Sequence, residues 1–156
     1  MLLIFLLARD AVGLSDALTA SFERELYAIA MLKPEYVWGG YQDPSKGLDC
    51  SGYIYLAVKW AAIPGPKRTT AKRMAEGRDG WDGSTIKPIK DADRGDLVFW
   101  TWKGSKRKYG HVGAVVLGRK SKLLEAAHAS SGHKSVVVVP FSGALLTDIE
   151  FFRRLR

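Results

Sequence analysis

The first part of the chain places apolar residues at helical spacing. A segment from residue 15 to about residue 33 predicts an amphipathic helix, with Ser15 as its N-cap and Pro34 as its end. A second helix is predicted from about Cys50 to Ala62, before a Pro-Gly-Pro break, and a short third helix from Thr70 to Glu76. The apolar face of the first helix is formed by Leu18, Phe22, Leu26 and Ile29.

After Trp81 the pattern changes to short segments that are rich in β-branched and aromatic residues and separated by glycines. Because the helices come first and the strands follow, the sequence predicts an α+β domain with an antiparallel sheet of about five to six strands. No repeat or linker interrupts this order, so we expect residues 1–156 to form a single domain. The predicted strands are Asp96–Trp102, His111–Leu117, Lys122–Ala129, Ser135–Pro140 and Glu150–Arg154.

The chain begins with an almost wholly apolar segment, Met1–Ala8. It is much shorter than the roughly 20 residues that span a bilayer, so we expect no stable membrane insertion. It also lacks a basic segment before it, and Arg9 and Asp10 follow at once where a signal peptide would have small residues. We therefore predict that this N-terminal apolar segment, within residues 1–14, packs on the core or is the remnant of a longer start.

The 156 residues include 24 Lys and Arg against 16 Asp and Glu, a formal net charge of +8. An excess of basic residues is common on an ordinary solvated surface. It also occurs in proteins that bind a polyanion such as nucleic acid, anionic lipid or cell wall. No helix-turn-helix, zinc-finger or ribonucleoprotein motif is present, so we expect no nucleic-acid partner. The most basic stretches are Lys67, Arg68, Lys72 and Arg73, and Lys103, Lys106, Arg107 and Lys108.

The single cysteine, Cys50, cannot form an intramolecular disulfide. A lone cysteine is usually buried and inert, but this one lies at the first turn of a predicted helix. There the free backbone N–H groups and the helix dipole favour a thiolate, which is the nucleophilic form. Asp49 is suited to cap the helix, and Gly52 leaves its first turn sterically open. The position therefore indicates a reactive cysteine.

A cysteine nucleophile needs a base, and the chain has three histidines. His111 opens a predicted strand between glycines, which leave room for a close approach. His128 lies on the next predicted strand, where it is able to orient His111, whereas His133 follows in a loop. One Cys and three His also make a conceivable zinc set, but no close pair of ligands has zinc-site spacing, so we expect no metal or other cofactor.

Acyl transfer also needs donors for the developing oxyanion. The backbone N–H of Cys50 is one candidate. Tyr36 is another, because the Gly39-Gly40 turn is able to fold its phenol back over the start of the helix; a plain core aromatic is the alternative interpretation.

Four segments in this order resemble the NlpC family of papain-like peptidoglycan endopeptidases. They are Tyr36-Val37-Trp38-Gly39-Gly40, Leu48-Asp49-Cys50-Ser51-Gly52, Arg94-Gly95-Asp96-Leu97-Val98-Phe99-Trp100 and His111-Val112-Gly113-Ala114-Val115-Val116, with a weaker fifth at Ala127-His128-Ala129. The resemblance implies a papain-like fold with Cys50 as nucleophile, His111 as base, His128 as orienting residue and Tyr36 at the oxyanion. It also implies that Asp49 and Ser51 help to bind the substrate's peptide stem.

By this resemblance we expect a monomeric endopeptidase that cleaves the γ-D-glutamyl–diamino-acid bond of peptidoglycan stem peptides. It would act at the bacterial cell envelope, whether secreted, periplasmic or delivered by a phage. Two alternatives share the same residues or the same fold. A thiol acyltransferase or amidase would use the same thioester chemistry. A non-catalytic cell-wall binding module would keep the fold and bind without turnover.

Overall fold

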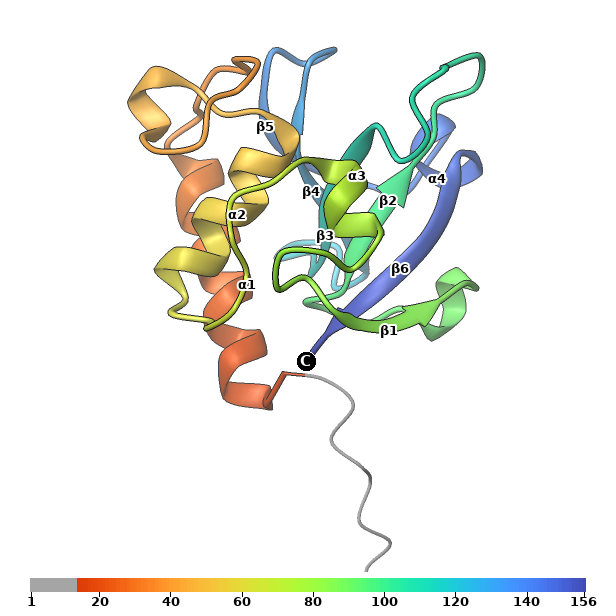
Figure 1. Cartoon of the computed structure of the whole chain (residues 1–156), viewed down its shortest axis with the longest axis horizontal. Coiled ribbons are helices and arrows are strands. Elements are labelled where there is room, and N and C mark those ends of the chain that lie inside the picture. Colours follow the sequence, from red (N-terminus) through yellow and green to blue (C-terminus); the bar gives the residue numbers. More distant parts are fainter. Residues whose placement is uncertain (1–13) are drawn as a thin grey trace, which may run out of the picture.

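A computed structural model describes residues 14–156, in which three helices precede a six-stranded sheet and a short fourth helix comes before its last strand (Figure 1). The predictions for the apolar segment Met1–Ala8 lie outside these residues. The helices are α1 (Asp16–Met31), α2 (Cys50–Trp60), α3 (Ala71–Ala75) and α4 (Ala144–Thr147), and the strands are β1 (Gly83–Ile86), β2 (Leu97–Trp100), β3 (His111–Leu117), β4 (Leu124–Ser130), β5 (Ser135–Pro140) and β6 (Ile149–Leu155).

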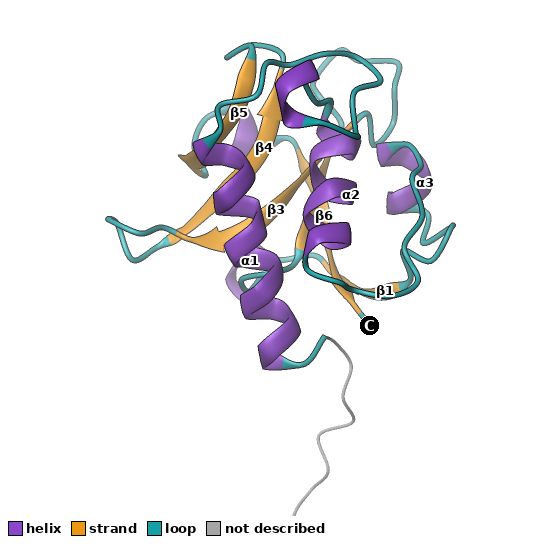
Figure 2. Ribbon diagram, turned by 90° about the vertical axis from the view of Figure 1, so that its left-hand side faces the viewer, coloured by secondary structure: helices purple, strands orange, loops and turns teal. Residues whose placement is uncertain are grey.

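The sheet has the strand order β1-β6-β2-β3-β4-β5, and every neighbouring pair is antiparallel. Helices α1 and α2 lie side by side over one face of this sheet (Figure 2). The α+β class and the antiparallel sheet predicted from the sequence are therefore confirmed. The short connections between β2, β3, β4 and β5 explain why these consecutive strands are also neighbours in space.

The two long helices begin where local capping chemistry places them. The Ser15 side chain accepts a hydrogen bond from the backbone N–H of Leu18 (3.3 Å), which satisfies a free donor at the start of α1. Asp49 caps α2 in the same way. Three of the four predicted apolar positions of α1 are fully buried, and Leu18 is half-buried. Helix α1 therefore buries the face that the sequence pattern predicts.

Strand β2 is buried on both faces because its side chains alternate between two apolar clusters. Leu97 and Phe99 join the main core between the helices and the sheet. Val98 and Trp100 point to the opposite face, where they pack with Phe152 of β6. All four residues of the strand are fully buried, so β2 forms a rigid centre beside β3, which carries His111 at its first position.

One strand and one α-helix of the structure are absent from the predicted set. Strand β1 contains a single large apolar residue, Ile86, and forms an edge strand through its pairing with β6. Helix α4 is one turn long. In both cases the local sequence is weak, and the element depends on its neighbours. Between residues 14 and 156, no helix combines the length and the apolar character that crossing a bilayer requires.

Candidate active site

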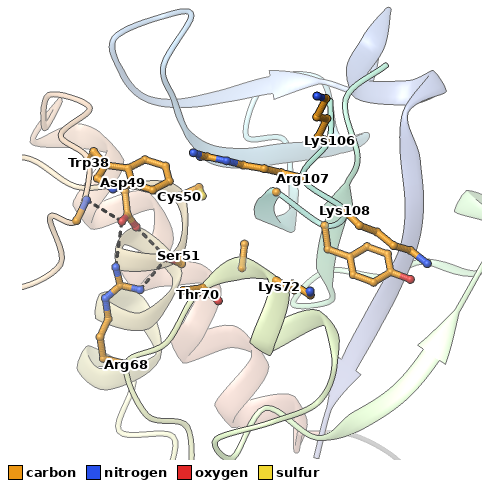
Figure 3. Close-up of a pocket in the computed structure, with 14 residues that line it drawn as sticks. Trp38, Asp49, Cys50, Ser51, Arg68, Thr70, Lys72, Lys106, Arg107 and Lys108 are labelled. Atoms are coloured by element: carbon orange, nitrogen blue, oxygen red, sulfur yellow. Dashed lines mark hydrogen bonds and ion pairs between the residues drawn. The ribbon is translucent and has the colours of Figure 1, made fainter. Parts of the chain in front are cut away.

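Cys50 is the first residue of α2 and faces a cleft of about 610 Å³ (Figure 3). The wall of the cleft on the α2 side comes from the loop before the helix and from the helix start. The opposite wall comes from α3 and from the loop between β2 and β3. The lining residues are Trp38, Gly39, Asp49, Cys50, Ser51, Arg68, Thr70, Ala71, Lys72, Lys106, Arg107, Lys108, Tyr109 and Gly110.

Asp49 organises the α2 side of this cleft through both of its carboxylate oxygens. Oδ1 accepts hydrogen bonds from the backbone N–H of Gly52 (2.6 Å) and from the Ser51 hydroxyl (2.9 Å). Oδ2 accepts from the backbone N–H of Gly39 and from the Arg68 guanidinium, both at 3.0 Å. One side chain therefore caps the helix, fixes the preceding loop at Gly39 and fixes Ser51, the residue after Cys50.

Arg68 completes this network by donating to the Ser51 hydroxyl at 2.7 Å. Arg68 belongs to the first basic stretch of the sequence, but it is not part of a solvated surface: its side chain is 23% exposed and forms an ion pair with Asp49. No local sequence signal links residues 49 and 68. Asp49 and Ser51, the predicted substrate-binding residues, line the cleft while they form these internal hydrogen bonds.

Two glycines allow the segment that follows Tyr36 to pack on the start of α2. A Cβ atom added to Gly52 would overlap the backbone carbonyl oxygen of Gly40, and one added to Gly40 would overlap that of Gly47. The backbone N–H of Asp49 also donates to the Gly40 carbonyl at 2.9 Å. The space at Gly52 that the sequence predicts is therefore filled by a neighbouring backbone.

Tyr36 lies close to Cys50 and is held there by a parallel bridge between Tyr36 and Leu48. Burial, together with smaller contributions from the charges of Cys50 and Asp49, raises the pKa of the Tyr36 phenol to about 12. The phenol is therefore neutral and able to donate a hydrogen bond at neutral pH. This is the protonation state that an oxyanion donor needs.

The two histidines of the predicted pair meet on neighbouring strands. Nε2 of His111 lies 2.8 Å from Nδ1 of His128, and both rings are buried. The Trp100 and Trp102 rings cover His111, with centroids at 5.3 and 5.2 Å. Gly113 leaves room for this packing, because a Cβ there would lie 3.0 Å from both the His128 Cβ and the Trp100 ring.

His133 stays outside this pair. It lies in the turn after β4, where its Nδ1 is 3.0 Å from the Ser130 hydroxyl. Among residues 14–156, no group of three or more His, Cys, Asp or Glu side chains is arranged to bind a metal ion. The described structure therefore does not assemble Cys50 and the three histidines into the zinc set considered from the sequence.

The pKa values show that burial dominates the electrostatics of these groups. Burial, followed by repulsion from Asp49, raises the pKa of the Cys50 thiol to about 11. The prediction of a favoured thiolate is therefore wrong for the free protein, because the helix N-terminus does not offset desolvation. Burial lowers the pKa of His111 to about 3 and that of His128 to about 4. All three groups are neutral at pH 7.

Cys50 and the histidine pair meet at the start of β3. The backbone N–H groups of Val112, the residue after His111, and of Ser51 act on the Cys50 thiol and lower its pKa, by less than burial raises it. Within residues 14–156 no hydrogen bond links the Cys50 thiol to either imidazole, and neither His111 nor Tyr36 lines the cleft. Catalytic hydrogen bonds are often loose in the absence of substrate, so this arrangement is compatible with a thiol and a base that act together.

The buried histidines should make the protein less stable in mild acid. Below pH 6.5 the unfolded chain binds protons at both histidines, whereas the native pKa values of about 4 and about 3 keep the folded rings neutral. We therefore expect the free energy of unfolding to fall from pH 6.5 towards pH 4, by up to about 1.4 kcal/mol per pH unit for each histidine. Urea denaturation between pH 5 and 7 measures this slope. A His128→Asn variant should show a shallower slope, and equal slopes would contradict the prediction.

A model of the NlpC/P60 family matches residues 33–144 of the chain. A curated relative, the γ-D-glutamyl-L-lysine dipeptidyl-peptidase of Bacillus subtilis (strain 168), is 32% identical over 85 residues. That match covers 54% of this chain and 25% of the relative, so the chain spans about a quarter of the relative's length.

Solved structures are similar over most of the chain. The NlpC/p60 domain of the peptidoglycan hydrolase SagA is 28% identical with a TM-score of 0.58, and the match covers 88% of this chain and 98% of that domain. The peptidoglycan hydrolase RipB from Mycobacterium tuberculosis is 25% identical with a TM-score of 0.59, over 91% of this chain and 68% of that one. An NLP/P60 family protein from Staphylococcus aureus, at 23% identity and a TM-score of 0.65, shares the fold over 92% of this chain and 43% of that one.

Proposed function

Since the chain belongs to the NlpC/P60 family, we propose that it is a cysteine peptidase that hydrolyses peptidoglycan stem peptides. The observation that carries this proposal is the position of Cys50. It lies in a cleft at the N-terminus of α2, and the backbone of Val112, the residue that follows His111, is close enough to influence the pKa of its thiol. The two solved relatives whose names describe peptidoglycan hydrolases support the substrate class.

In the proposed reaction the Cys50 sulfur attacks the carbonyl carbon of the scissile amide. Because the resting thiol is neutral, its proton must move to His111 as the substrate binds and the attack begins. His111 then gives this proton to the leaving amine, which departs and leaves an acyl thioester on Cys50. A water molecule, deprotonated by His111, attacks the thioester and releases the acid product and the thiol.

His128 has the geometry to stabilise the charged base. For Nδ1 of neutral His111 to accept a proton, the ring must carry its own proton on Nε2, so the contact with His128 is a hydrogen bond from His111 Nε2–H to His128 Nδ1 that strengthens when His111 becomes charged. This leaves the other nitrogen of His111, Nδ1, for the exchange of protons with Cys50. His128 therefore acts through His111 as a positioning residue.

The oxyanion of the tetrahedral intermediate needs donors near Cys50. The backbone N–H of Cys50 belongs to the first turn of α2, where helix geometry provides no carbonyl acceptor for it. The neutral Tyr36 phenol lies near both Cys50 and Asp49. We propose that these two groups donate to the oxyanion, while Asp49 and Ser51 shape the stem-binding side of the cleft through their network with Arg68.

We propose that the bond cleaved is the γ-D-glutamyl–diamino-acid bond, in line with the name of the curated relative from Bacillus subtilis. This chemistry requires no metal or cofactor. The substrate places the protein at the bacterial cell envelope. We further propose that the chain is a single papain-like peptidase domain that works as a monomer.

The test is mass spectrometry of defined muropeptides and intact peptidoglycan after incubation with the purified protein. New stem-peptide fragments that end at γ-D-glutamate are expected with the wild type and not with Cys50→Ala, which controls for contaminating hydrolases. Products joined to an added amine would instead indicate an acyltransferase, and release of the stem from its sugar would indicate an amidase. Binding without any product, from a folded protein, would favour a cell-wall binding module.

A further inference from the structure

The cleft in front of Cys50 has an uneven distribution of charge. Figure 3 shows Trp38, Asp49 and Arg68 on one side of Cys50, and Lys72, Lys106 and Lys108 on the other. Asp49 is the single acidic residue of the lining, and its charge is compensated by Arg68 at 3.0 Å. Four further cations line the cleft, namely Lys72, Lys106, Arg107 and Lys108.

These four cations have little internal compensation. None of the ion pairs within residues 14–156 involves Lys106, Arg107 or Lys108. Lys72 has one, an exposed contact of 3.9 Å with Glu76 that contributes little. Together the four cations give this side of the cleft a positive potential, which favours an anionic group of a bound ligand.

Arg107 ties this cationic side to the α2 side of the cleft. Its guanidinium carbon lies 5.1 Å from the centre of the Trp38 ring, which is 71% exposed. The two residues come from loops on opposite sides of Cys50 (Figure 3). A cation–π contact of this kind positions the guanidinium while leaving its N–H donors free for a ligand. Arg107 and Trp38 therefore meet within the lining of the cleft that contains Cys50.

We propose that Lys72, Lys106, Arg107 and Lys108 form a subsite that binds a free carboxylate of the substrate next to the scissile bond. This inference rests on the proposed peptidase function and adds a charge requirement to it. An extended peptide whose carbonyl reaches the Cys50 sulfur meets the compensated Asp49–Arg68 pair on one side and the uncompensated cations on the other. The carboxylate strengthens binding there because the site supplies donors and positive charge together.

Two carboxylates of a stem peptide have this chemistry. One is the free α-carboxylate of the γ-linked D-glutamate, and the other is the side-chain carboxylate of a diamino acid such as diaminopimelate. Conversion of either group to its primary amide removes the charge and changes the size very little. A set of four peptides, with neither, one, the other or both carboxylates amidated, therefore separates the two sources.

The experiment measures binding of these four peptides by calorimetry to the Cys50→Ala protein, in which no product forms. We expect amidation of the recognised carboxylate to weaken binding about tenfold, the effect of losing one charge-assisted contact. The difference should shrink as the salt concentration rises from 0.05 to about 0.5 M, because both charges are partly exposed to solvent.

Matched variants separate the subsite from the overall charge. The cleft variant carries Lys106→Gln, Arg107→Gln and Lys108→Gln, and the control carries Lys87→Gln, Lys90→Gln and Lys120→Gln. Both lose three charges, but the control residues lie outside the cleft. We expect the cleft variant to bind acid and amide peptides equally, and the control to keep the wild-type preference. Circular dichroism and the thermal midpoint confirm that both variants are folded.

The outcomes distinguish this inference from the proposed function. If the protein with all its cleft cations binds the four peptides equally, the subsite is overturned. It is also overturned if the cleft variant still prefers the acid peptides over the amides. Each of these results leaves hydrolysis by the wild type unaffected. A preference that the cleft variant abolishes supports the subsite. If the wild type at the same time cleaves none of the four peptides, the subsite stands and the proposed peptidase function fails.

Discussion

Replacement of His111 by alanine should lower kcat by about 10⁴-fold or more, whereas His128→Ala should cost ten to a hundred times less than that. His111 transfers the proton itself, because the buried Cys50 thiol has a pKa of about 11 and does not ionise at pH 7 without a base. His128 contacts only the far nitrogen of His111, at 2.8 Å, and affects the reaction through the orientation and charge of that ring. Single-turnover kinetics with a defined stem peptide provide the measurement.

A conservative variant separates orientation from packing at His128. Asparagine has an amide group near the position of the His128 Nδ1 atom, so His128→Asn should regain part of the activity that His128→Ala loses. A purely structural role would leave these two variants equally impaired once their thermal midpoints match. Equal losses of kcat in His111→Ala and His128→Ala would contradict the assigned roles.

The Gly52→Ala variant should be less stable by about 2 kcal/mol or more and should lose most of its activity. In a helix this change normally stabilises by up to about 1 kcal/mol, because alanine has the higher helix propensity. Here the added Cβ would overlap the Gly40 carbonyl oxygen, and neither backbone is able to move freely. The displaced segment connects directly to Tyr36 and Trp38, so the cleft should be distorted as well.

Chemical denaturation and kcat/KM with the same stem peptide test this expectation. Gly132→Ala is the matched control, because a Cβ at that position would meet nothing closer than the Ser130 hydroxyl at 3.7 Å. The control should change the free energy of unfolding by less than about 0.5 kcal/mol. A Gly52→Ala protein that is more stable than the wild type would show that the Gly40 loop is not packed on α2 as described.

The cleft combines two features that oppose each other. Burial keeps Cys50, His111 and His128 neutral in the free protein, which protects the thiol from ionisation. The same desolvation strengthens every charge interaction once a substrate supplies the developing oxyanion. The site is thus arranged to stabilise charge during the reaction and not before it.

The sequence by itself determined the elements whose signals are local. Ser15 and Asp49 are caps that act on backbone groups within three residues, and the helices begin where these residues predict. The strands His111–Leu117 and Ser135–Pro140 have the predicted bounds because their apolar runs end at turn residues. The pairing of His111 with His128 was also predictable, since consecutive antiparallel strands are usually neighbours.

The tertiary structure alone decided the features that depend on distant segments. Strand β1 exists because β6, about 70 residues later, supplies its hydrogen-bond partners. Arg68 is a member of the Cys50 environment because the chain returns past Asp49, and no local pattern encodes that contact. The pKa of Cys50 is raised and not lowered, because burial by the assembled core outweighs the helix N-terminus that the sequence displays. Short-range hydrogen bonding is encoded locally, whereas desolvation and charge compensation arise only when the whole chain has folded.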